Sequence, residues 1–332
     1  MASAPRPYAA RLVARALLHR LCTEVMRMTM RFPDFTVGLG HRHRSVTVFP
    51  LFLTTPPAAV DYDLAHDVIT RGGALVEEVN ERGDVGRLRV VNNGPKALLF
   101  LEGEHLLGAK QNRIVNTTSL IPPRSKVSLP VSCVERGRWH DAGAHRFDPS
   151  ACMAPAGLRR VVKASVTHSV VTRAGFVANQ RGVWDCIAQG EARLGARSPT
   201  QALQDLFATH QQRLSGYTGT LGYVDRACGV AMGIGPQVVS IDLFDRPSTC
   251  KRFWSRLLAG TALEALQDHD QLGSVDTREV QRAVADACGS RWIKTPAVGL
   301  GDEYRSRDTE QVAASALAVS GTFIHLSIAQ GR

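Results

Sequence analysis

Short apolar segments separated by turn residues fill the region between residues 46 and 135, and no helical period connects them. These segments are VTVFPLFL (46–53), LVEEV (75–79), RLRVVN (87–92), ALLFL (97–101), RIVNTTSLI (113–121) and KVSLPVSCVE (126–135). Turn-forming stretches such as NERGDVG and NNGPK lie between them. Closely spaced strands without intervening helices are typical of antiparallel sheets. We therefore predict an antiparallel sandwich or a strongly curled sheet for this half of the chain.

The second half alternates helical and strand patterns, which predicts an α+β half and an α+β class overall. Helices are predicted at 183–194, from Ser198 with Pro199 and the capping-box partner Gln201, from about Pro247, and from Asp276 with Glu279. Hairpins are predicted at 228–244 and 314–328. Residues 137–157 show no period and are predicted to form a long loop. The predicted organisation is a basic non-globular extension (1–31), a β-rich half (32–150) and an α+β half (151–332) packed closely on it.

Composition narrows the class of protein to a globular one without a membrane span. With 332 residues and 44% hydrophobic content, the chain can form one large or two medium domains. No apolar run of about 18 residues is present, so we expect no membrane-spanning helix. The seven cysteines stand singly, without a C-x-x-C pair. This pattern argues against a zinc site or a disulfide framework and suits the reducing cytoplasm.

The net charge of +10 does not indicate a nucleic-acid partner, because half of it lies in residues 1–31. This segment holds six arginines and one acidic residue, Glu24. It is either an organelle transit peptide or an upstream-extended start, and methionines just before the globular part favour the second reading. The chain lacks a basic stripe with interleaved aromatic residues, which single-strand binding requires. We therefore expect no nucleic-acid partner.

A polar motif, GEHLLGAKQNR (103–113), follows the ALLFL segment, whereas the common nucleotide-loop, nucleophile-elbow and zinc signatures are absent. In one straight strand Lys110 would face away from Gln111 and Arg113, so these side chains could not share a ligand. Gly103 and Gly108 provide candidate positions where the backbone can bend. Four consecutive long polar side chains also suit a half-buried strand poorly. We therefore predict a bend at Gly108–Asn112 that directs Lys110, Gln111 and Arg113 into a common space.

A second polar stretch, SCVERGRW (132–139), offers a carboxylate that is predicted to face inward. Glu135 continues the parity of the apolar alternation before it, and a buried carboxylate without a partner costs several kcal/mol. Arg113 or Lys110 is the expected nearest cation, and Arg138 is a further candidate. Pro122-Pro123 forces a turn between the two stretches, so antiparallel pairing should set Arg113 opposite residues 131–135. The two stretches are therefore predicted to meet, as a ligand site or as an ion-pair network that ties two hairpins together.

Two other chemistries are less well supported. Cys133 lies in the apolar alternation, where a cysteine behaves as a small hydrophobic residue unless a neighbour lowers the pKa of its thiol. His41 and His43 have His-x-His spacing and could join Glu104 or His105 at a metal, but no third ligand is recognisable. We therefore predict neither a metal site nor a cofactor.

These stretches resemble the ARG-and-rhodanese-phosphatase-superfamily-associated protein domain, the first of the two families so named. The resemblance rests on LEGEHLLGAKQNRIVNTTSLIP, LPVSCVERGRW, NQRGVWDCIAQGEARLGARSPTQAL and VVSIDLFDRPSTCKRFWSRLL, and it runs from about residue 34 to 330. It implies a bacterial-type intracellular domain whose gene neighbours include ADP-ribosylglycohydrolases, and hence a role in NAD or ADP-ribose metabolism. The family-like positions are Gly103, Glu104, Gly108, Lys110, Gln111, Arg113, Asn116, Cys133, Glu135, Arg138, Trp139 and Trp184. Relatives are expected to have an acidic residue in place of His105 and an aspartate in place of Glu102, which argues against a metal or paired-carboxylate scheme there.

Two hypotheses follow. In the first, the protein binds or processes a phosphorylated, nucleotide-like small molecule, with ADP-ribose derivatives as the best single candidate. Lys110 and Arg113 would hold phosphate, and Trp139 would stack. Glu104 or Glu135 would be the general base or ribose anchor. The full set of expected ligand contacts is Lys110, Gln111, Asn112, Arg113, Asn116, Arg138 and Trp139.

In the second hypothesis the polar cluster is structural, and the protein is a non-catalytic interaction module. Sheet edges or the C-terminal hairpin would then mediate homo-oligomerisation. Burial separates the two hypotheses. Mutual pairing of Lys110, Arg113 and Glu135 without a cavity favours the module, and an open pocket lined by them favours the ligand site.

Overall fold

Three β-sheets and the helices packed on them make up an α+β fold, as the sequence predicted. The computed structural model describes residues 33–57, 59–139, 145–267, 272–307 and 312–331, and the predicted extension at 1–31 lies outside them. The largest sheet has nine strands within the described residues. Its order is β1 (Phe35–Val37), β3 (Val46–Leu53), β13 (Gly229–Ile234), β14 (Gln237–Phe244), β18 (Thr322–Gln330), β17 (Val312–Val319), β16 (Asp302–Ser306) and β15 (Trp292–Pro296), with β2 (His41–His43) paired to β3. Because β3 pairs with β13, strands from both halves of the chain share this sheet.

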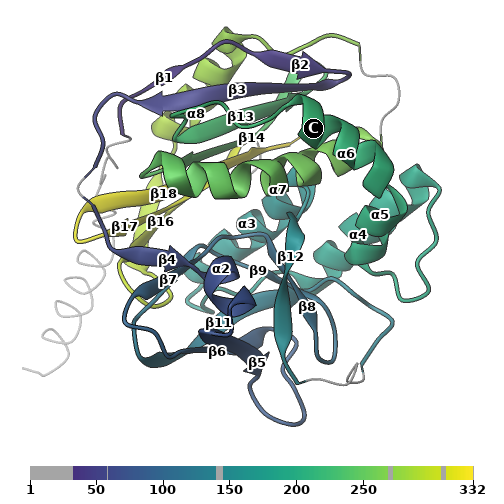
Figure 1. The fold of residues 1–332 in the computed structure, drawn as a ribbon, viewed down its shortest axis with the longest axis vertical. Helices are drawn as coiled ribbons and strands as arrows, with labels where there is room; N and C mark the ends of the chain where they lie inside the picture. Colours follow the sequence, from purple (N-terminus) through teal and green to yellow (C-terminus); the bar gives the residue numbers. More distant parts are fainter. Residues whose placement is uncertain (1–32, 58, 140–144, 268–271, 308–311, 332) are drawn as a thin grey trace, which may run out of the picture.

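The region that carries the polar motif forms two smaller sheets, which lie below α7 in Figure 1. The six-stranded sheet has the order β12 (Phe147–Met153), β8 (Glu104–Gly108), β9 (Arg113–Val115), β11 (Ser125–Cys133), β6 (Arg87–Asn92) and β5 (Ala74–Glu78). The three-stranded sheet has the order β10 (Ser119–Ile121), β7 (Ala97–Phe100) and β4 (Tyr62–Leu64), in which β4 and β7 are parallel. One short helix, α2 (Ala65–Thr70), packs against β5, β7 and β12. The prediction of a strand-rich first half is confirmed.

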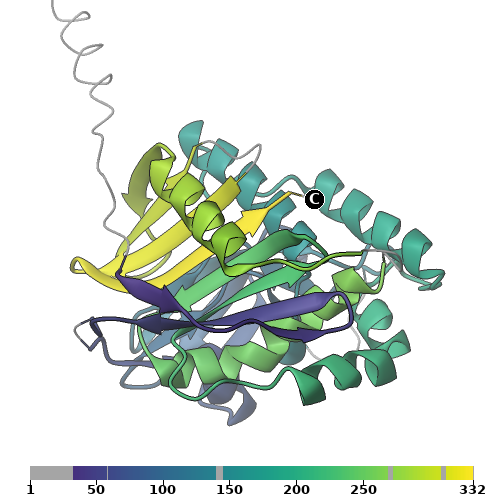
Figure 2. The same ribbon diagram turned by 90° about the horizontal axis from the view of Figure 1, so that it is seen from above.

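Two long helices fill the space between the large sheet and the smaller sheets (Figure 1). α7 (Pro247–Ala265) packs against β13, β14 and β12, and α3 (Ala156–Val171) packs against β17 and β18. α8 (Thr277–Gly289) covers the other face of the large sheet through contacts with β1, β14 and β17 (Figure 2). Beside α3 and α7 lie α4 (Gln180–Leu194), α5 (Leu203–Thr209) and α6 (Gln211–Thr220). The main core is therefore a helical layer closed by sheet on two sides.

Local predictions hold where a turn or cap is encoded by adjacent residues. The two C-terminal hairpins form as β13–β14 and β17–β18, and Asp276 and Glu279 make the predicted capping box. Other predictions are wrong. The helix expected from Ser198 begins only at Leu203, because Gln201 has a positive φ of 50° that a helix does not accommodate.

Two further stretches differ from their predicted form. Residues 137–157 are not one continuous loop, because β12 forms within them and pairs with β8. Residues 113–121 are not one strand, because β9 and β10 belong to different sheets. Within the described residues, no helix combines the length and hydropathy needed to cross a membrane.

Candidate functional site

The predicted bend between the two polar halves of the motif is present. β8 ends at Gly108, which has φ of 131°, and Ala109 follows with φ of 38°. A Cβ at Gly108 would lie 2.4 Å from the carbonyl oxygen of Arg146, so the close approach of the chain beside β12 requires glycine here. The side chain of Asn112 closes the bend by accepting a hydrogen bond from the Gly108 amide at 3.1 Å.

The two polar stretches meet in space, as predicted. β9 and β11 are antiparallel neighbours, and their register places Cys133 opposite Arg113. Beyond the last paired residues, the Asn112 amide donates to Glu135 Oε2 at 3.1 Å. Gln111 Nε2 donates to the Glu135 carbonyl oxygen at 2.8 Å. The bend and the end of β11 therefore form one assembly. We call it the Glu135 cluster, and it comprises Glu78, Lys110, Gln111, Asn112, Arg113, Cys133, Glu135, Arg138 and Trp139.

The cation that pairs with Glu135 is Arg138, whereas Arg113 or Lys110 was the expected nearest one. Arg138 donates from Nε to Oε1 at 2.8 Å and from its terminal nitrogen to Oε2 at 2.7 Å. Thr200 Oγ1 adds a donor to Oε1 at 3.1 Å. Burial alone would raise the pKa of Glu135, but the hydrogen bonds from Arg138 and the Asn112 amide hold that pKa below its usual value. Glu135 is therefore a saturated carboxylate, and such a group is a weak general base.

Arg113 is enclosed rather than open to solvent. Its side chain has 0% exposure, and one terminal nitrogen donates to the Gln111 carbonyl oxygen at 2.9 Å. The other terminal nitrogen lies 3.9 Å from Glu78 Oε1, and the guanidinium carbon lies 5.8 Å from the centre of the Trp139 ring. Sequence reasoning missed Glu78. It continues the inward parity of Ala74 and Val76 on β5, so the argument applied to Glu135 would have found it.

The outer layer of the Glu135 cluster is formed by Lys110, Arg138 and Trp139. Lys110 is half-buried, and its stem lies over Gly83, where a Cβ would be 2.9 Å from Lys110 Cδ. Trp139 is 46% exposed, whereas the Arg138 side chain is 13% exposed. The solvent-facing indole of Trp139 therefore lies over the buried guanidinium of Arg113.

Other predicted site residues have structural partners. Asn116 donates from Nδ2 to the carbonyl oxygens of Val131 at 3.2 Å and Phe176 at 3.0 Å, so it ties β11 to the loop before α4. Cys133 is buried, and its thiol donates to Gln111 Oε1 at 3.0 Å. Burial raises the pKa of this thiol although Arg113 opposes the shift, so Cys133 is not an activated nucleophile.

Glu104 pairs in a different place from Glu135. It is buried on β8 and accepts a hydrogen bond from Arg256 of α7 at 2.9 Å. Burial raises the pKa of Glu104, and Arg256 counteracts part of that shift. Its neighbour His105 has 0% exposure, and burial lowers the pKa of His105 to about 3. The residues that the structure describes contain no group of three or more His, Cys, Asp or Glu side chains able to hold a metal.

A second buried assembly, which we call the Glu102 cluster, consists of Glu102, Arg159, Lys163, Asp242, Ser315, His325 and Ser327. Glu102 Oε1 accepts hydrogen bonds from Lys163, from Ser327 at 2.8 Å and from Arg159 at 3.3 Å. Arg159 also forms a two-point pair with Asp242 at 2.8 and 2.5 Å. The cluster joins α3 to the large sheet and to the β7–β8 turn. Sequence reasoning noted Glu102 but had no local signal for Arg159, which pairs with both Glu102 and Asp242.

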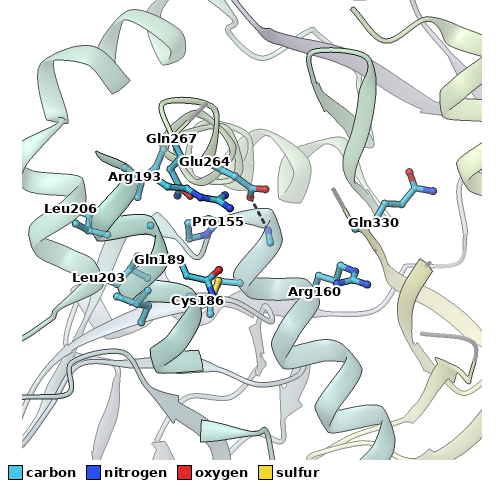
Figure 3. Close-up of a pocket in the computed structure, with 16 residues that line it drawn as sticks. Pro155, Arg160, Cys186, Gln189, Arg193, Leu203, Leu206, Glu264, Gln267 and Gln330 are labelled. Atoms are coloured by element: carbon cyan, nitrogen blue, oxygen red, sulfur yellow. Dashed lines mark hydrogen bonds between the residues drawn. The ribbon is translucent and has the colours of Figure 1, made fainter. Parts of the chain in front are cut away.

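Pockets occur elsewhere in the described structure. One lies between α3, α4, α5 and α7 (Figure 3), another beside α8 and a third beside β1. Their lining residues do not include members of the Glu135 cluster.

A family model matches residues 34–329, which run from the residue before β1 into the last strand, β18. The chain belongs to the ARG and Rhodanese-Phosphatase-superfamily-associated Protein domain family. The family match therefore covers the whole three-sheet fold, including both buried clusters. No curated protein and no solved structure matches the chain.

Proposed function

We propose that the protein binds a phosphorylated, nucleotide-like small molecule on the outer side of the Glu135 cluster, with ADP-ribose derivatives as the first class to test. The observation that carries this proposal is the half-exposed Trp139 ring lying over the buried Arg113 guanidinium. A nucleobase stacked on an aromatic side chain contributes about 1–3 kcal/mol. The Arg113 guanidinium lies under the Trp139 ring, so the ring is a pre-formed surface for such stacking.

The charge of the cluster suits an anionic ligand. Lys110, Arg113 and Arg138 carry three positive charges against the two carboxylates Glu78 and Glu135. Lys110 is the half-buried lysine of the outer layer, and a lysine ammonium binds phosphate as a compact point charge. Arg138 pairs with Glu135 and acts as a positioning residue. The enclosed Arg113 supplies positive potential beneath the indole rather than a direct phosphate contact.

Binding is better supported than turnover. Glu135 is saturated with donors, Glu104 faces Arg256 in another part of the fold, and Cys133 is kept as a thiol. None of these three groups combines the exposure and the pKa that a general base or nucleophile at this surface would need. The proposal is therefore a binding or sensing domain.

Isothermal titration calorimetry on the full chain tests this proposal with ADP-ribose, NAD, AMP and ribose 5-phosphate. We expect AMP to bind at least tenfold more tightly than ribose 5-phosphate, because only AMP has a base to stack. Trp139→Ala should weaken ADP-ribose binding by roughly 5- to 150-fold, the equivalent of about 1–3 kcal/mol. Trp139→Phe should retain most of the affinity. Lys126→Gln, on the exposed face of β11 and outside the Glu135 cluster, is the control substitution. Absence of binding by the wild-type chain at millimolar ligand would refute the proposal.

The second candidate function is a non-catalytic interaction module in which the cluster only joins strands. It is favoured by the mutual pairing of Gln111, Arg113 and Glu135 within the buried layer, and by the three pockets described above, none of which is lined by the Glu135 cluster. Under this function the wild-type chain binds none of the four ligands, and light scattering after size exclusion shows a stable homo-oligomer.

A further inference from the structure

Arg113 and Glu78 form a buried ion pair whose charges stay apart. Their side chains have exposed fractions of 0% and 4%, and Arg113 Nη2 lies 3.9 Å from Glu78 Oε1. Arg113 Nε and Nη2 and both carboxylate oxygens of Glu78 have no hydrogen-bond partner among the described residues. A pair at this distance lacks the charge-assisted hydrogen bonds that join an arginine closely to a carboxylate. Glu78 therefore compensates the charge of Arg113 only in part.

The other neighbours of the Arg113 guanidinium do not remove its charge. Its third nitrogen, Nη1, donates to the carbonyl and side-chain oxygens of Gln111 at 2.9 and 3.3 Å, and both are neutral acceptors. Burial raises the pKa of the adjacent Cys133 thiol, so this group is also neutral at pH 7. The next charges, Arg138 and Glu135, pair with each other. Burial lowers the pKa of Arg113 itself, but an arginine keeps its proton in a protein.

This positive charge lies against one face of the Trp139 indole. The guanidinium carbon is 5.8 Å from the centre of the ring, which belongs to a residue that is 46% exposed. The face of an aromatic ring is negative and attracts cations, so an indole without such a neighbour favours a positively charged base. Here Arg113 already uses that attraction from beneath. A base stacked on the opposite face therefore meets the field of a cation through the ring.

The size of this effect follows from the distances. A stacked base has its centre at least about 4.5 Å from the indole centre, which places it roughly 10 Å from the Arg113 guanidinium. Two positive charges at roughly 10 Å repel, and the repulsion lowers affinity by a factor of about 2 in water and about 15 in partly buried surroundings. The sign is opposite to the preference of a free indole.

We propose that Arg113 makes the Trp139 surface selective for neutral nucleobases and against cationic ones. This inference rests on the proposed function, and it names the part of the ligand that stacks. Adenine is neutral at pH 7, whereas the oxidised nicotinamide ring of NAD carries a positive charge. NAD would therefore place its adenine, and not its nicotinamide, on Trp139. Arg113 acts through the indole without touching the ligand, so it is a positioning residue.

Calorimetry on the full chain at pH 7 tests the inference with AMP and two methylated analogues. The base of 1-methyl-AMP is a cation, whereas N6-methyl-AMP has the same added methyl group without the charge. We expect 1-methyl-AMP to bind at least about threefold more weakly than AMP, and N6-methyl-AMP to stay within about twofold of AMP. If AMP binds and 1-methyl-AMP binds equally well or more tightly, this inference is overturned and the proposed function stands. The inference is also overturned if N6-methyl-AMP is weakened as much as 1-methyl-AMP. Absence of binding by all three overturns both.

Two variants change the charge beneath the indole in opposite directions. Glu78→Gln removes the partial compensation and should raise the preference for AMP over 1-methyl-AMP by at least about twofold. Arg113→Met removes the cation and should bring 1-methyl-AMP level with AMP or make it the tighter ligand. A purely structural role would weaken both ligands alike, so an unchanged ratio in the folded variants overturns the inference. If Arg113→Met does not fold, Glu78→Gln decides alone, because glutamine keeps nearly the same shape. Arg181→Gln, at a side chain 91% exposed on α4, is the control and should leave the ratio unchanged.

Discussion

Replacing Lys163 with methionine should destabilise the fold strongly, because it leaves the buried Glu102 carboxylate with one cation. Lys163 is 1% exposed, and its Nζ binds Glu102 Oε1 and also donates to Ser315 Oγ at 2.8 Å. Breaking a buried ion pair by removing one partner costs about 3–5 kcal/mol. Arg159 remains 3.3 Å from Glu102 but also serves Asp242, so we expect a loss near the lower end, about 3 kcal/mol.

The same contacts set the pKa of Glu102. Burial would raise this pKa, but Lys163 and Arg159 lower it from 4.5 to about 2. Because the folded pKa is depressed, the stabilisation is present above pH 4.5 and is lost as the pH falls toward 2. The difference corresponds to roughly 3 kcal/mol at neutral pH for the carboxylate alone. Burial lowers the pKa of its partner Lys163 to about 8, so a desolvation cost at the cation offsets part of this stabilisation. A loss of that size is a large fraction of the 5–15 kcal/mol that typically stabilises a domain.

Urea unfolding at pH 7, followed by circular dichroism, measures the effect in a double-mutant cycle. The variants are Lys163→Met, Glu102→Gln and the two combined, with Lys126→Met on the exposed face of β11 as control. We expect the combined loss in free energy of unfolding to be about 2 kcal/mol smaller than the sum of the single losses. The reasoning is refuted if the two losses add to within about 0.5 kcal/mol, since additive sites do not interact.

Two further predictions concern the motif strand. Both ring nitrogens of His105 are buried without a hydrogen-bond partner among the described residues, so His105→Leu should raise the free energy of unfolding by about 1 kcal/mol at pH 7.5. The folded pKa of His105 is depressed from 6.5 to about 3, so wild type loses stability as the pH falls below 6.5. Urea titrations at pH 7.5 and pH 5 should therefore show that the free-energy advantage of His105→Leu over wild type grows by about 2 kcal/mol. An unchanged difference between the two pH values would contradict this account. Gly108→Ala should cost at least about 2 kcal/mol, because its Cβ would lie 2.4 Å from the Arg146 carbonyl oxygen at a φ of 131°. Gly222→Ala, where a Cβ meets no atom within 4 Å, is the control, and equal thermal shifts for the two variants would contradict the steric argument.

Strand parity and turn chemistry predicted much of the motif region. The inward direction of Glu135 followed from the alternation along β11, and the turn at Pro122-Pro123 led to the observed pairing of Cys133 with Arg113. The same alternation indicates Glu78 on β5. These features depend on residues within one or two hairpins, where backbone geometry fixes both direction and register.

The partners of the buried charges could not be predicted in the same way. Glu104 meets Arg256, which lies 152 residues away in sequence, and Glu102 meets Ser327, which lies 225 residues away. An alternation shows that a side chain faces inward, but it does not show which other element faces it. The pairing of β3 with β13 could not be predicted for the same reason, because neither strand contains a local signal for the other. For Glu135, the sequence pattern left three candidate cations. The turn after β11 places Arg138, rather than Arg113 or Lys110, against the carboxylate.

The end of β11 is fixed from several sides, and this rigidity bears on the proposed nucleotide surface. The Gln180 side chain binds both the amide and the carbonyl of Cys133 at 2.8 Å. The Leu203 amide donates to the Val134 carbonyl oxygen at 2.9 Å, and the bend residues bind Glu135. Each peptide from Cys133 to Glu135 is thus held by an element other than β11 itself. Trp139 follows Glu135 by four residues and its ring lies over Arg113, so the ring is attached to a segment of fixed backbone. An aromatic side chain that is already ordered loses little conformational entropy when a base stacks on it. The ordered, exposed ring of Trp139 is therefore consistent with the proposed nucleotide surface.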